Sequence, residues 1–426
     1  MINIAVLGYG TVGSGVVEVL DTNRECISQR VGEEIRVKYV LDLRDFPGRS
    51  PYKAENICLI HFQSVRQNIL IHNFEEIIRD EDVKIVVEVM GGIEPAYTFV
   101  KRSLLAGKSV ATSNKALVAK HGAELLSIAK EKQINFLFEA SVGGGIPIIR
   151  PLNSSMTADE IEEITGILNG TTNYMLTKMF YEGAGYEEVL RQAQENGYAE
   201  KNPEADVEGY DACRKIAILS SLISGHQVDF EDIYTEGITE ITERDMEYAK
   251  QMQMTIKLLA SSRRSGECLS AIVAPCLLEN THPLFGVNGV FNAIFVHGNV
   301  LGDAMFYGSG AGKLPTASAV VADVVEEAKN LNRNVMTMWK SDKLKLQDKG
   351  DTIRRFFVRI TGNAEAMKTY IESIFGPVQI VMLPDVEEEF GFLTGRMTER
   401  AYEECAAKFP NIIRMIRMQE QSGSKE

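Results

Sequence analysis

The chain has few cysteines and histidines, and neither residue type forms a recognisable cluster. None of the six cysteines lies in a CxxC pair, and the six histidines include no HxH or HxxxH pair. Scattered cysteines in a chain of 426 residues indicate reduced thiols rather than a disulfide framework. The missing histidine pairs disfavour a zinc-dependent enzyme.

Basic residues and long apolar stretches are also scarce. Lys and Arg number 45 against 59 Asp and Glu, which gives a formal net charge of −14. Nucleic acids and anionic membranes both require clustered basic residues. No apolar run approaches the roughly 18 residues that suggest a membrane span, and the sequence begins with a strand rather than a basic leader. We therefore expect a cytoplasmic protein that binds a small molecule, with neither nucleic acid nor membrane as partner.

Residues 1–140 alternate short β-branched runs with helical stretches. Strands are predicted at Ile2–Leu7, Ile35–Leu41, Val83–Val89 and Ser109–Thr112. Continuous apolar strands separated by helices are typical of a parallel sheet that is covered on both faces. The fold class predicted here is α/β, with an N-terminal doubly wound Rossmann domain at 1–140. A later helical stretch, at about 310–335, is expected to pack back on this domain.

The order of elements changes after residue 140. Residues 141–309 mix strands, one of them near Ser270–Pro275, with the helices Thr172–Tyr181 and Tyr210–Ser224, which predicts an α+β domain. A polar, weakly periodic stretch at 336–354 is predicted to be a linker. Residues 355–426 then follow a βαββαβ order, which is typical of a ferredoxin-like domain.

A glycine motif, Gly8-Tyr9-Gly10-Thr11-Val12-Gly13, follows the first strand and opens a helix. The first two glycines permit a tight turn and a close approach of the backbone to a pyrophosphate, and Gly13 lets the helix pack on the strand. The helix N-terminus offers N–H groups and a positive dipole end to phosphate. In this position the motif predicts a dinucleotide, NAD or NADP.

The end of the second strand carries the residues expected to meet the adenosine ribose. Asp42 would bond the ribose hydroxyls and favour NAD, whereas Arg44 would attract a 2′-phosphate and favour NADP. Both residue types are present, so the sequence leaves the choice open.

The segment Ala193–Lys215 is rich in acids and could be no more than a solvated loop. The helix that follows argues otherwise, because Asp211 and Lys215 lie in one stripe with Ile218 and Leu222. Charges on an apolar face must be paired, and burial shifts a lysine toward the pKa range that is useful for proton transfer. The plain alternative is a structural Asp–Lys pair within the helix.

Three further segments follow predicted strands. Asn114-Lys115 comes after Ser109–Thr112, at an end where open α/β sheets bind ligands. The glycine-rich stretch 139–147 suggests a close backbone approach to a ligand or an ion. In 166–174, Thr171 or Thr172 is predicted either to cap a helix or to form a floor for substrate.

Taken together, these segments resemble the homoserine dehydrogenase family. The stretch Ala193–Lys215 is similar to the signature of that family at every characteristic position, and five others match in order over roughly residues 1–330. They are GYGTVG, SNKALVA, EASVGGGIPII, GILNGTTNYML and GSGAGKLPTASAVVAD. The resemblance implies NAD(P)H-dependent reduction of L-aspartate 4-semialdehyde to L-homoserine, a step of threonine and methionine biosynthesis. It also implies that 141–309 binds substrate and forms the interface of a homodimer or homotetramer.

Carried over position by position, the resemblance implies a role for each matching residue. Lys215 and Lys115 would handle the proton, with Asp211 orienting Lys215. Substrate would be bound by Glu200, Asp206, Thr171 and Gly170. The cofactor would be bound by Gly8, Gly10, Thr11, Val12, Gly13, Asp42, Arg44, Ser113, Lys115 and Gly312. A structural sodium ion, found in some members of the family, would be held by Glu139, Val142, Gly144 and Ile146.

The C-terminal unit lies where many members of the family carry an ACT domain, which often binds threonine as a feedback inhibitor. Here Thr361–Ala366 replaces the usual acidic residue and Pro-Gly before the first helix of that domain. We expect an ACT-like fold that serves either regulation or oligomerisation. Two other functions stay open at this point: a dehydrogenase of another small amino or hydroxy acid, and a non-catalytic nicotinamide sensor.

Overall fold

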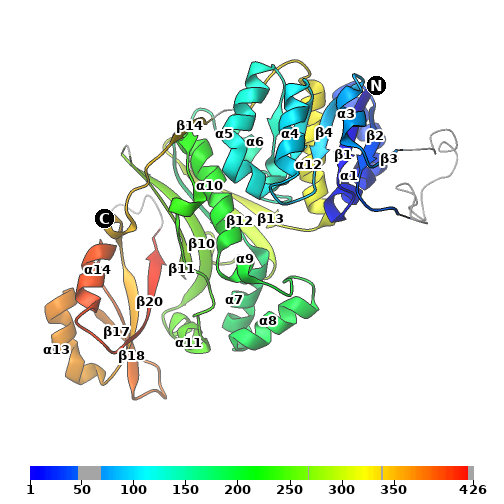
Figure 1. Ribbon diagram of the computed structural model, residues 1–426. Helices are drawn as coiled ribbons and strands as arrows, with labels where there is room; N and C mark the ends of the chain where they lie inside the picture. Colours follow the sequence, from blue (N-terminus) through cyan, green and yellow to red (C-terminus); the bar gives the residue numbers. More distant parts are fainter. Residues whose placement is uncertain (47–68, 267, 337–338, 421–426) are drawn as a thin grey trace. The chain divides into compact units, whose positions relative to one another are not determined.

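The computed structural model describes residues 1–46, 69–266, 268–336 and 339–420 (Figure 1). Cys58 and His61, which were counted above, lie outside these residues. The chain divides into two compact units. Unit 1 comprises 1–157, 224–227 and 309–343, and unit 2 comprises 158–223, 228–308 and 344–426.

A six-stranded parallel sheet forms the centre of unit 1, in the order β3-β2-β1-β4-β5-β6. This is the strand order of a Rossmann domain, so the prediction for the N-terminal region is confirmed. The strands are β1 (Ile2–Leu7), β2 (Ile35–Leu41), β3 (Leu70–Ile71), β4 (Val83–Glu88), β5 (Ser109–Thr112) and β6 (Phe136–Leu137).

Helices flank this sheet, and the last of them comes from a distant part of the chain. α12 (Lys313–Lys329) shares a core with β1 and with α1 (Thr11–Thr22), in which Ala317 and Val320 are fully buried. Unit 1 therefore contains this helix together with the N-terminal strands. The other helices are α2 (Arg24–Val31), α3 (Phe74–Arg79), α4 (Ala96–Leu105), α5 (Lys115–Glu131), the short 3-10 helix η1 (Glu139–Ser141) and α6 (Ile149–Ser154).

Unit 2 is built on a ten-stranded mixed sheet, whose main path runs β13-β12-β7-β10-β11-β20-β16-β18-β17. The first strands on this path are β7 (Ile161–Ile167), β10 (Met254–Ser265), β11 (Cys268–Glu279), β12 (Phe291–Gly298) and β13 (Gly302–Ser309), while β9 (Tyr234–Thr235) pairs with β11. The helices are α7 (Gly170–Glu182), α8 (Tyr186–Glu195), α9 (Glu204–Val207), α10 (Tyr210–Ser224) and α11 (Glu243–Gln251).

Apart from one additional two-residue strand, the C-terminal residues follow the predicted βαββαβ order, and they continue the sheet of unit 2. Within this module the strands run β20-β16-β18-β17, and β20 pairs with β11 on its other edge. Its elements are β16 (Phe356–Thr361), α13 (Ala364–Phe375), β17 (Gln379–Val381), β18 (Glu389–Leu393), β19 (Met397–Thr398), α14 (Glu399–Ala406) and β20 (Ile412–Gln419). We refer to residues 355–420 as the C-terminal module.

The described part of 336–354 is more ordered than its polar sequence suggests. It contains β14 (Lys340–Lys343), which pairs with β8 (His226–Gln227), and β15 (Ile353–Arg354), which pairs with β19. Trp339 is fully buried and donates its indole N–H to Gln227 Oε1 at 2.8 Å. A Cβ on Gly122 would lie 2.3 Å from the Trp339 ring, so a glycine is required on α5 where this ring packs.

Over the described residues, no helix has both the length and the apolar character that a membrane span requires.

Candidate functional site

The glycine motif forms a tight turn between β1 and α1. Gly8 has a φ of +95°, a conformation that favours glycine, and a Cβ on Gly13 would lie 1.9 Å from the carbonyl oxygen of Gly8. Gly10 is the N-cap of α1, where no side chain caps the helix and no acidic residue lies in the first turn. The first turn therefore presents uncapped N–H groups, with the positive end of the helix dipole, to an anion.

Asp42 and Arg44 interact directly at the end of β2. The Asp42 carboxylate accepts hydrogen bonds from the Tyr9 N–H at 2.8 Å and from Nε and Nη2 of Arg44, both at 2.9 Å. These bonds, led by those from Arg44, hold the pKa of Asp42 well below its usual range. The Asp42 side chain is thus fixed against the glycine turn, whereas the Arg44 side chain is 63% exposed. The two residues expected to select the cofactor are paired with each other.

A buried acid lies where β4 and β5 end side by side. Glu88 is fully buried and accepts hydrogen bonds from the Met90 N–H at 2.8 Å and the Thr112 hydroxyl at 2.6 Å. Burial raises its pKa. Asn114 caps α5 by accepting from the Leu117 N–H at 3.1 Å, and its amide donates to the carbonyl of Gly92 at 2.5 Å. These bonds fix the turns at the carboxyl ends of two strands, which is where open α/β sheets bind ligands.

Lys115, Ser113 and Gly312 lie at chain turns of the same unit. Lys115 is the first residue of α5, whose first turn has no acidic residue. A cation is unfavourable at this end of the helix dipole, so its presence suggests a functional reason. The Ser113 N–H donates to the carbonyl of Glu88 at 3.3 Å, and Gly312, with a φ of +118°, is the N-cap of α12.

Glu139 organises the glycine-rich loop that leads into α6. Its carboxylate accepts three backbone N–H groups, those of Ile148 at 2.6 Å, Ile149 at 2.8 Å and Arg150 at 2.7 Å. The loop is tightly closed, because a Cβ on Gly144 would lie 2.1 Å from the carbonyl oxygen of Gly310. Among the described residues, no backbone N–H donates to the carbonyls of Val142, Gly144 or Ile146.

Two further buried acids lie one helical turn apart on α12. Asp323 accepts the N–H of Glu139 at 2.8 Å and the guanidinium of Arg150 at 2.5 Å, and burial followed by the charge of Glu139 raises its pKa to about 7. Glu327 is fully buried, and neither of its carboxylate oxygens has a hydrogen-bond partner among the described residues. Burial, then the charge of Asp323, raises its pKa well above the ordinary value.

Glu327→Gln is expected to stabilise the protein increasingly as the pH rises. An acid whose pKa is raised on folding holds its proton in the folded state above about pH 4, where the unfolded chain has lost it. Folding stability therefore falls as the pH rises from about 4 toward the folded-state pKa, and glutamine removes this loss. Melting temperatures at pH 5 and pH 8 measure the effect, and we expect a gain of about 3 °C or more at pH 8.

Glu326→Gln is the matched control, because Glu326 precedes Glu327 on α12 and is only partly buried. Glu326→Gln makes the same chemical change at a side chain that is not fully buried, so an effect of the substitution itself would appear in both variants. An equal pH response of the two variants would contradict the assignment of a buried proton to Glu327.

In unit 2, Lys215 and Asp211 form a buried ion pair on the first turns of α10. Their N···O distance is 2.7 Å, and Lys215 Nζ also donates to the carbonyl of Leu168 at 2.7 Å. Lys215 is only 8% exposed and Asp211 only 4%. The predicted burial of both charges is therefore observed, and a solvated acidic loop is not a sufficient description of this segment.

Asn169 joins this ion pair to a second acid. Its side-chain amide donates to Asp206 Oδ1 at 2.7 Å and to Asp211 Oδ2 at 3.1 Å, while its oxygen accepts the Thr172 N–H at 2.9 Å. Asn169 is thus the N-cap of α7, and the prediction that Thr171 or Thr172 caps this helix was wrong. Asparagine is a preferred N-cap residue, a signal that was available in the sequence.

The other predicted substrate residues lie near the start of α7 or outside the network. The Thr171 hydroxyl donates to the carbonyl of Tyr198 at 2.6 Å. A Cβ on Gly170 would lie 2.7 Å from the carbonyl oxygen of Val290, so only glycine fits there. Glu200 is exposed, and its carbonyl accepts a hydrogen bond from the Gln194 side chain. The structure therefore gathers Asp206, Asp211 and Lys215 around Asn169 and leaves the Glu200 side chain outside.

Comparisons with known proteins decide the family. The model of the homoserine dehydrogenase NAD binding domain matches residues 8–139, and that of homoserine dehydrogenase matches residues 147–325. The homoserine dehydrogenase of Bacillus subtilis is 42% identical over 334 residues, which cover 78% of this chain and 74% of that protein. The chain belongs to the homoserine dehydrogenase family. It is therefore an NAD(P)-dependent oxidoreductase, and the alternatives of another dehydrogenase or a non-catalytic sensor are set aside.

Solved homoserine dehydrogenases share the fold. A crystal structure of the Thiobacillus denitrificans enzyme matches with a TM-score of 0.86 and 34% identity over 98% of each chain. A hyperthermophilic archaeal homoserine dehydrogenase in complex with NADPH matches with a TM-score of 0.64 and 29% identity, over 78% of this chain and 99% of that one. The first match includes the C-terminal module, because it extends over nearly the whole chain.

Proposed function

We propose that this homoserine dehydrogenase reduces L-aspartate 4-semialdehyde to L-homoserine with Lys215 as the proton donor to the substrate oxygen. The observation that carries the proposal is the buried pair of Lys215 and Asp211, held by Leu168 and Asn169. An ammonium in this setting is fixed in direction and shielded from bulk water. A surface lysine would have neither property.

The chemistry divides between the bound coenzyme and the side chains. When bound, the reduced nicotinamide supplies a hydride to the aldehyde carbon, which leaves negative charge on the aldehyde oxygen. Lys215 donates a proton to that oxygen, and Asp211 orients Lys215 through the 2.7 Å contact. In the reverse direction the same lysine accepts the proton of the homoserine hydroxyl. Lys115, on the cofactor unit, is the second lysine to which the resemblance gives this role.

Asp206 and Glu200 are proposed to bind the substrate ammonium. Asp206 is partly exposed and is held by Asn169, so its carboxylate is fixed in place beside the ion pair of Lys215 and Asp211. Glu200 is exposed and lies in the same acidic segment as Asp206. Gly170 and Thr171 form the floor of the site at the N-terminus of α7, whose dipole favours the negative carboxylate of the substrate.

The cofactor is proposed to lie on the glycine turn, with its phosphates at Gly8, Gly10, Thr11, Val12 and Gly13. Ser113, Lys115 and Gly312 would lie near the nicotinamide, and Asp42 and Arg44 near the adenosine ribose. A related archaeal enzyme was solved with NADPH, which supports a nicotinamide coenzyme, NAD or NADP.

Arg44→Ala is expected to lower the preference for NADPH over NADH. The exposed guanidinium is suited to a 2′-phosphate, and its removal also leaves the Asp42 carboxylate without its nearest cation. That carboxylate would then repel a phosphate and accept bonds from ribose hydroxyls. We expect KM for NADPH to rise by about 10-fold or more, with a much smaller change for NADH. Arg24→Ala is the control, since Arg24 is paired with Glu34 elsewhere in unit 1. If the ratio of KM for NADPH to KM for NADH is the same in both variants, the role of Arg44 is contradicted.

A monovalent cation, sodium in some members of the family, is proposed at the loop of Glu139, Val142, Gly144 and Ile146. The residues fit such an ion. The Glu139 carboxylate already accepts hydrogen bonds from three N–H groups. The ligands of the ion would therefore be backbone carbonyl oxygens, which are hard oxygen ligands. Bound there, the cation would fix the loop that leads into α6.

The C-terminal module is proposed to be an ACT-like domain, and the enzyme to be a cytoplasmic homodimer or homotetramer in threonine and methionine biosynthesis. The strand order of the module agrees with a ferredoxin-like fold. β13 ends the sheet of unit 2 and exposes Met305 and Tyr307. An edge strand with exposed apolar side chains is a surface on which a second copy can pair.

A direct assay tests the proposed reaction. The purified chain should oxidise homoserine with NAD or NADP, followed by nicotinamide absorbance, and should reduce aspartate semialdehyde in reverse. Serine, threonine and 2-hydroxybutyrate serve as comparison substrates. A kcat/KM for one of these that equals or exceeds that for homoserine would contradict the assigned substrate.

A further inference from the structure

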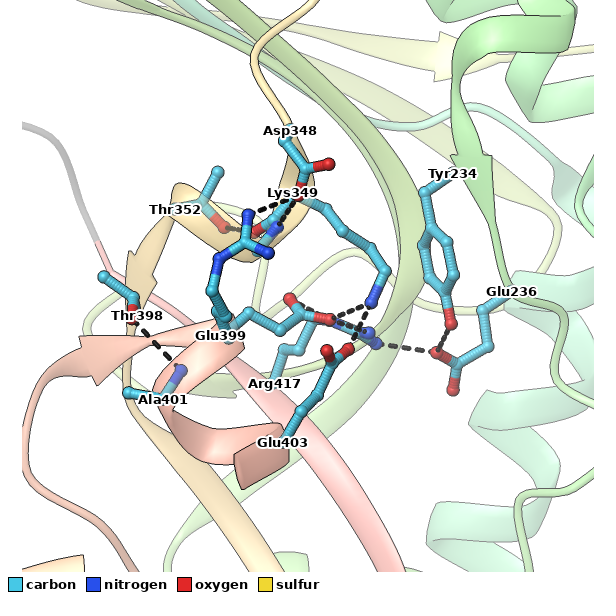
Figure 2. A network of polar contacts seen from close by, with 12 residues as sticks. Tyr234, Glu236, Asp348, Lys349, Thr352, Thr398, Glu399, Ala401, Glu403 and Arg417 are labelled. Carbon is cyan, nitrogen blue, oxygen red and sulfur yellow. Dashed lines mark hydrogen bonds and ion pairs between the residues drawn. The ribbon is translucent and has the colours of Figure 1, made fainter. Parts of the chain in front are cut away.

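A buried ionic network joins the C-terminal module to the segment that follows α10. Arg417 on β20 lies between two acids, as Figure 2 shows. Its Nε and Nη2 donate to the two oxygens of Glu399, at 3.0 and 2.6 Å, and its Nη1 donates to Glu236 at 2.6 Å. Glu399 starts α14 and is buried, whereas Glu236 directly follows β9.

The Arg417 guanidinium at the centre of the network stays protonated. Burial by itself lowers the pKa of Arg417, but the bonds to Glu399 and Glu236 outweigh it, so the net pKa is raised. Lys349 adds bonds to Glu399 at 3.1 Å and Glu403 at 2.7 Å. Arg417 also lies over the Tyr234 ring at 5.1 Å. A buried ion pair with this many bonds is costly to disrupt, because removing one member leaves a charge uncompensated.

The segment Tyr234–Ile238 connects this network to the acids proposed to bind substrate. The Glu236 N–H donates to the carbonyl of Val273 on β11 at 2.8 Å, and the Ile238 N–H donates to the carbonyl of Val207 at 2.8 Å. Val207 follows Asp206 on α9. A Cβ on Gly237 would lie 2.3 Å from the same Val207 oxygen, so the two backbones are in direct contact.

Asp206 in turn is held by Asn169, which also bonds the Asp211–Lys215 pair. A continuous path of hydrogen bonds and close backbone contacts therefore runs from Arg417 through Glu236 and Val207 to Asp206, all within unit 2. Packed side chains and hydrogen bonds of this kind can carry energetic coupling between separate parts of a protein.

From this path we propose that Glu236 is a positioning residue for homoserine, and that Arg417 makes the C-terminal module part of the substrate-binding apparatus. The inference rests on the proposed role of Asp206. Glu236 holds its segment against α9, α9 holds Asp206 at the distance at which Asn169 bonds it, and Arg417 fixes Glu236 from the C-terminal strand. The Glu236 side chain bonds Arg417 and Tyr234, and it acts on Asp206 through the backbone of its own segment.

The structure offers a matched control four residues further along. Glu240 forms an ion pair with Arg414, also on β20, at 3.1 Å, but Glu240 is 77% exposed. Glu236→Gln and Glu240→Gln thus each remove one carboxylate that pairs the chain between β9 and α11 with β20. Only the first carboxylate belongs to the segment that contacts α9 through Gly237 and Ile238.

The test compares steady-state kinetics of the two variants in the full-length enzyme. Glu236→Gln should raise KM for homoserine by about 3- to 30-fold, with a smaller change in kcat and a KM for the nicotinamide coenzyme within about 2-fold of wild type. Glu240→Gln should match the wild-type enzyme in all three. A merely structural role would instead lower the melting temperature without this split between the two substrates. An unchanged KM for homoserine in Glu236→Gln overturns the inference.

Two further variants keep the result interpretable. Asp206→Asn, assayed in parallel, tests the proposed function: if it leaves KM for homoserine unchanged, the assignment of Asp206 fails. If Asp206→Asn raises KM and Glu236→Gln does not, the inference about Glu236 alone fails. Should Glu236→Gln not fold, Tyr234→Phe carries the test, because it removes only the hydroxyl that donates to Glu236 at 3.2 Å. The inference is overturned if KM for homoserine in Tyr234→Phe equals that of Glu240→Gln.

Discussion

Lys215→Ala is expected to lower kcat for homoserine oxidation by about 10²–10⁴-fold, the usual worth of a positioned general acid or base. Lys215 is held in place by Asp211 and by the carbonyl of Leu168, each at 2.7 Å, and alanine removes the only proton-carrying group of this side chain. The dissociation constant of the coenzyme, measured by quenching of protein fluorescence, should change little, because the coenzyme phosphates are proposed to lie on the glycine turn, to which Lys215 does not belong.

Two lysine variants separate proton transfer from other effects. Lys201→Ala removes an exposed lysine of the same acidic segment and should leave kcat unchanged. Lys115→Ala ranks the two lysines, since the one that donates the proton should show the larger loss of kcat. Lys215→Ala leaves the buried Asp211 without its cation, which is expected to destabilise the protein. Coenzyme binding and the melting temperature are therefore measured to establish that the variant is folded. A folded Lys215→Ala enzyme within a few-fold of wild-type kcat would exclude Lys215 from proton transfer.

The Rossmann sheet was predictable because each of its main strands is marked by a short run of neighbouring residues. The strands Ile35–Leu41 and Ser109–Thr112 have the predicted bounds, since a strand buried on both faces of a parallel sheet is a short, continuous apolar run. The helix Tyr210–Ser224 was likewise predicted with the observed bounds from its apolar stripes. Its two charges were identified because they interrupt an apolar face, which is costly unless the charges are paired.

The long hairpin of β10 and β11 shows where such local patterns fail. Only Ser270–Pro275 was predicted to be a strand here, yet each strand has twelve residues. β10 is buried along most of its length, so it lacks the alternation that marks a half-exposed strand. It also carries Lys257, a fully buried lysine whose amine donates to three oxygens, including the carbonyl of Val287 at 2.6 Å. A charged residue in the middle of a run breaks the apolar pattern, and only the fold supplies its partners.

The central role of Asn169 was missed for a related reason. Its partners Asp206 and Asp211 lie 37 and 42 residues away in the chain. Sequence patterns identified each of these residues within a separate segment, but the bond between them exists only after β7, α9 and α10 pack. The same holds for Arg417 and Glu236, which are 181 residues apart. Residue types and their local spacing indicate which chemistry is present, whereas the connections between them depend on tertiary contacts.

Gly13→Ala is expected to raise KM for the coenzyme by about 100-fold and to lower the melting temperature. The added methyl would lie 1.9 Å from the carbonyl oxygen of Gly8, a backbone atom that cannot rotate away. The helix must therefore move away from the strand, and the N–H groups at its start move with it. Displacing the anion-binding turn weakens coenzyme binding, and the lost packing between α1 and β1 destabilises unit 1.

Gly10→Ala separates these two effects. A Cβ on Gly10 would have no atom within 4 Å, and its φ of −78° suits any residue, so the free protein should melt at the wild-type temperature. The methyl would instead occupy the space through which a pyrophosphate approaches the backbone, so KM for the coenzyme should still rise. If Gly10→Ala leaves both stability and coenzyme KM unchanged, the phosphates do not lie at this turn. If it lowers the coenzyme affinity alone, while Gly13→Ala lowers affinity and stability together, then Gly10 serves the ligand, whereas Gly13 serves the fold on which ligand binding depends.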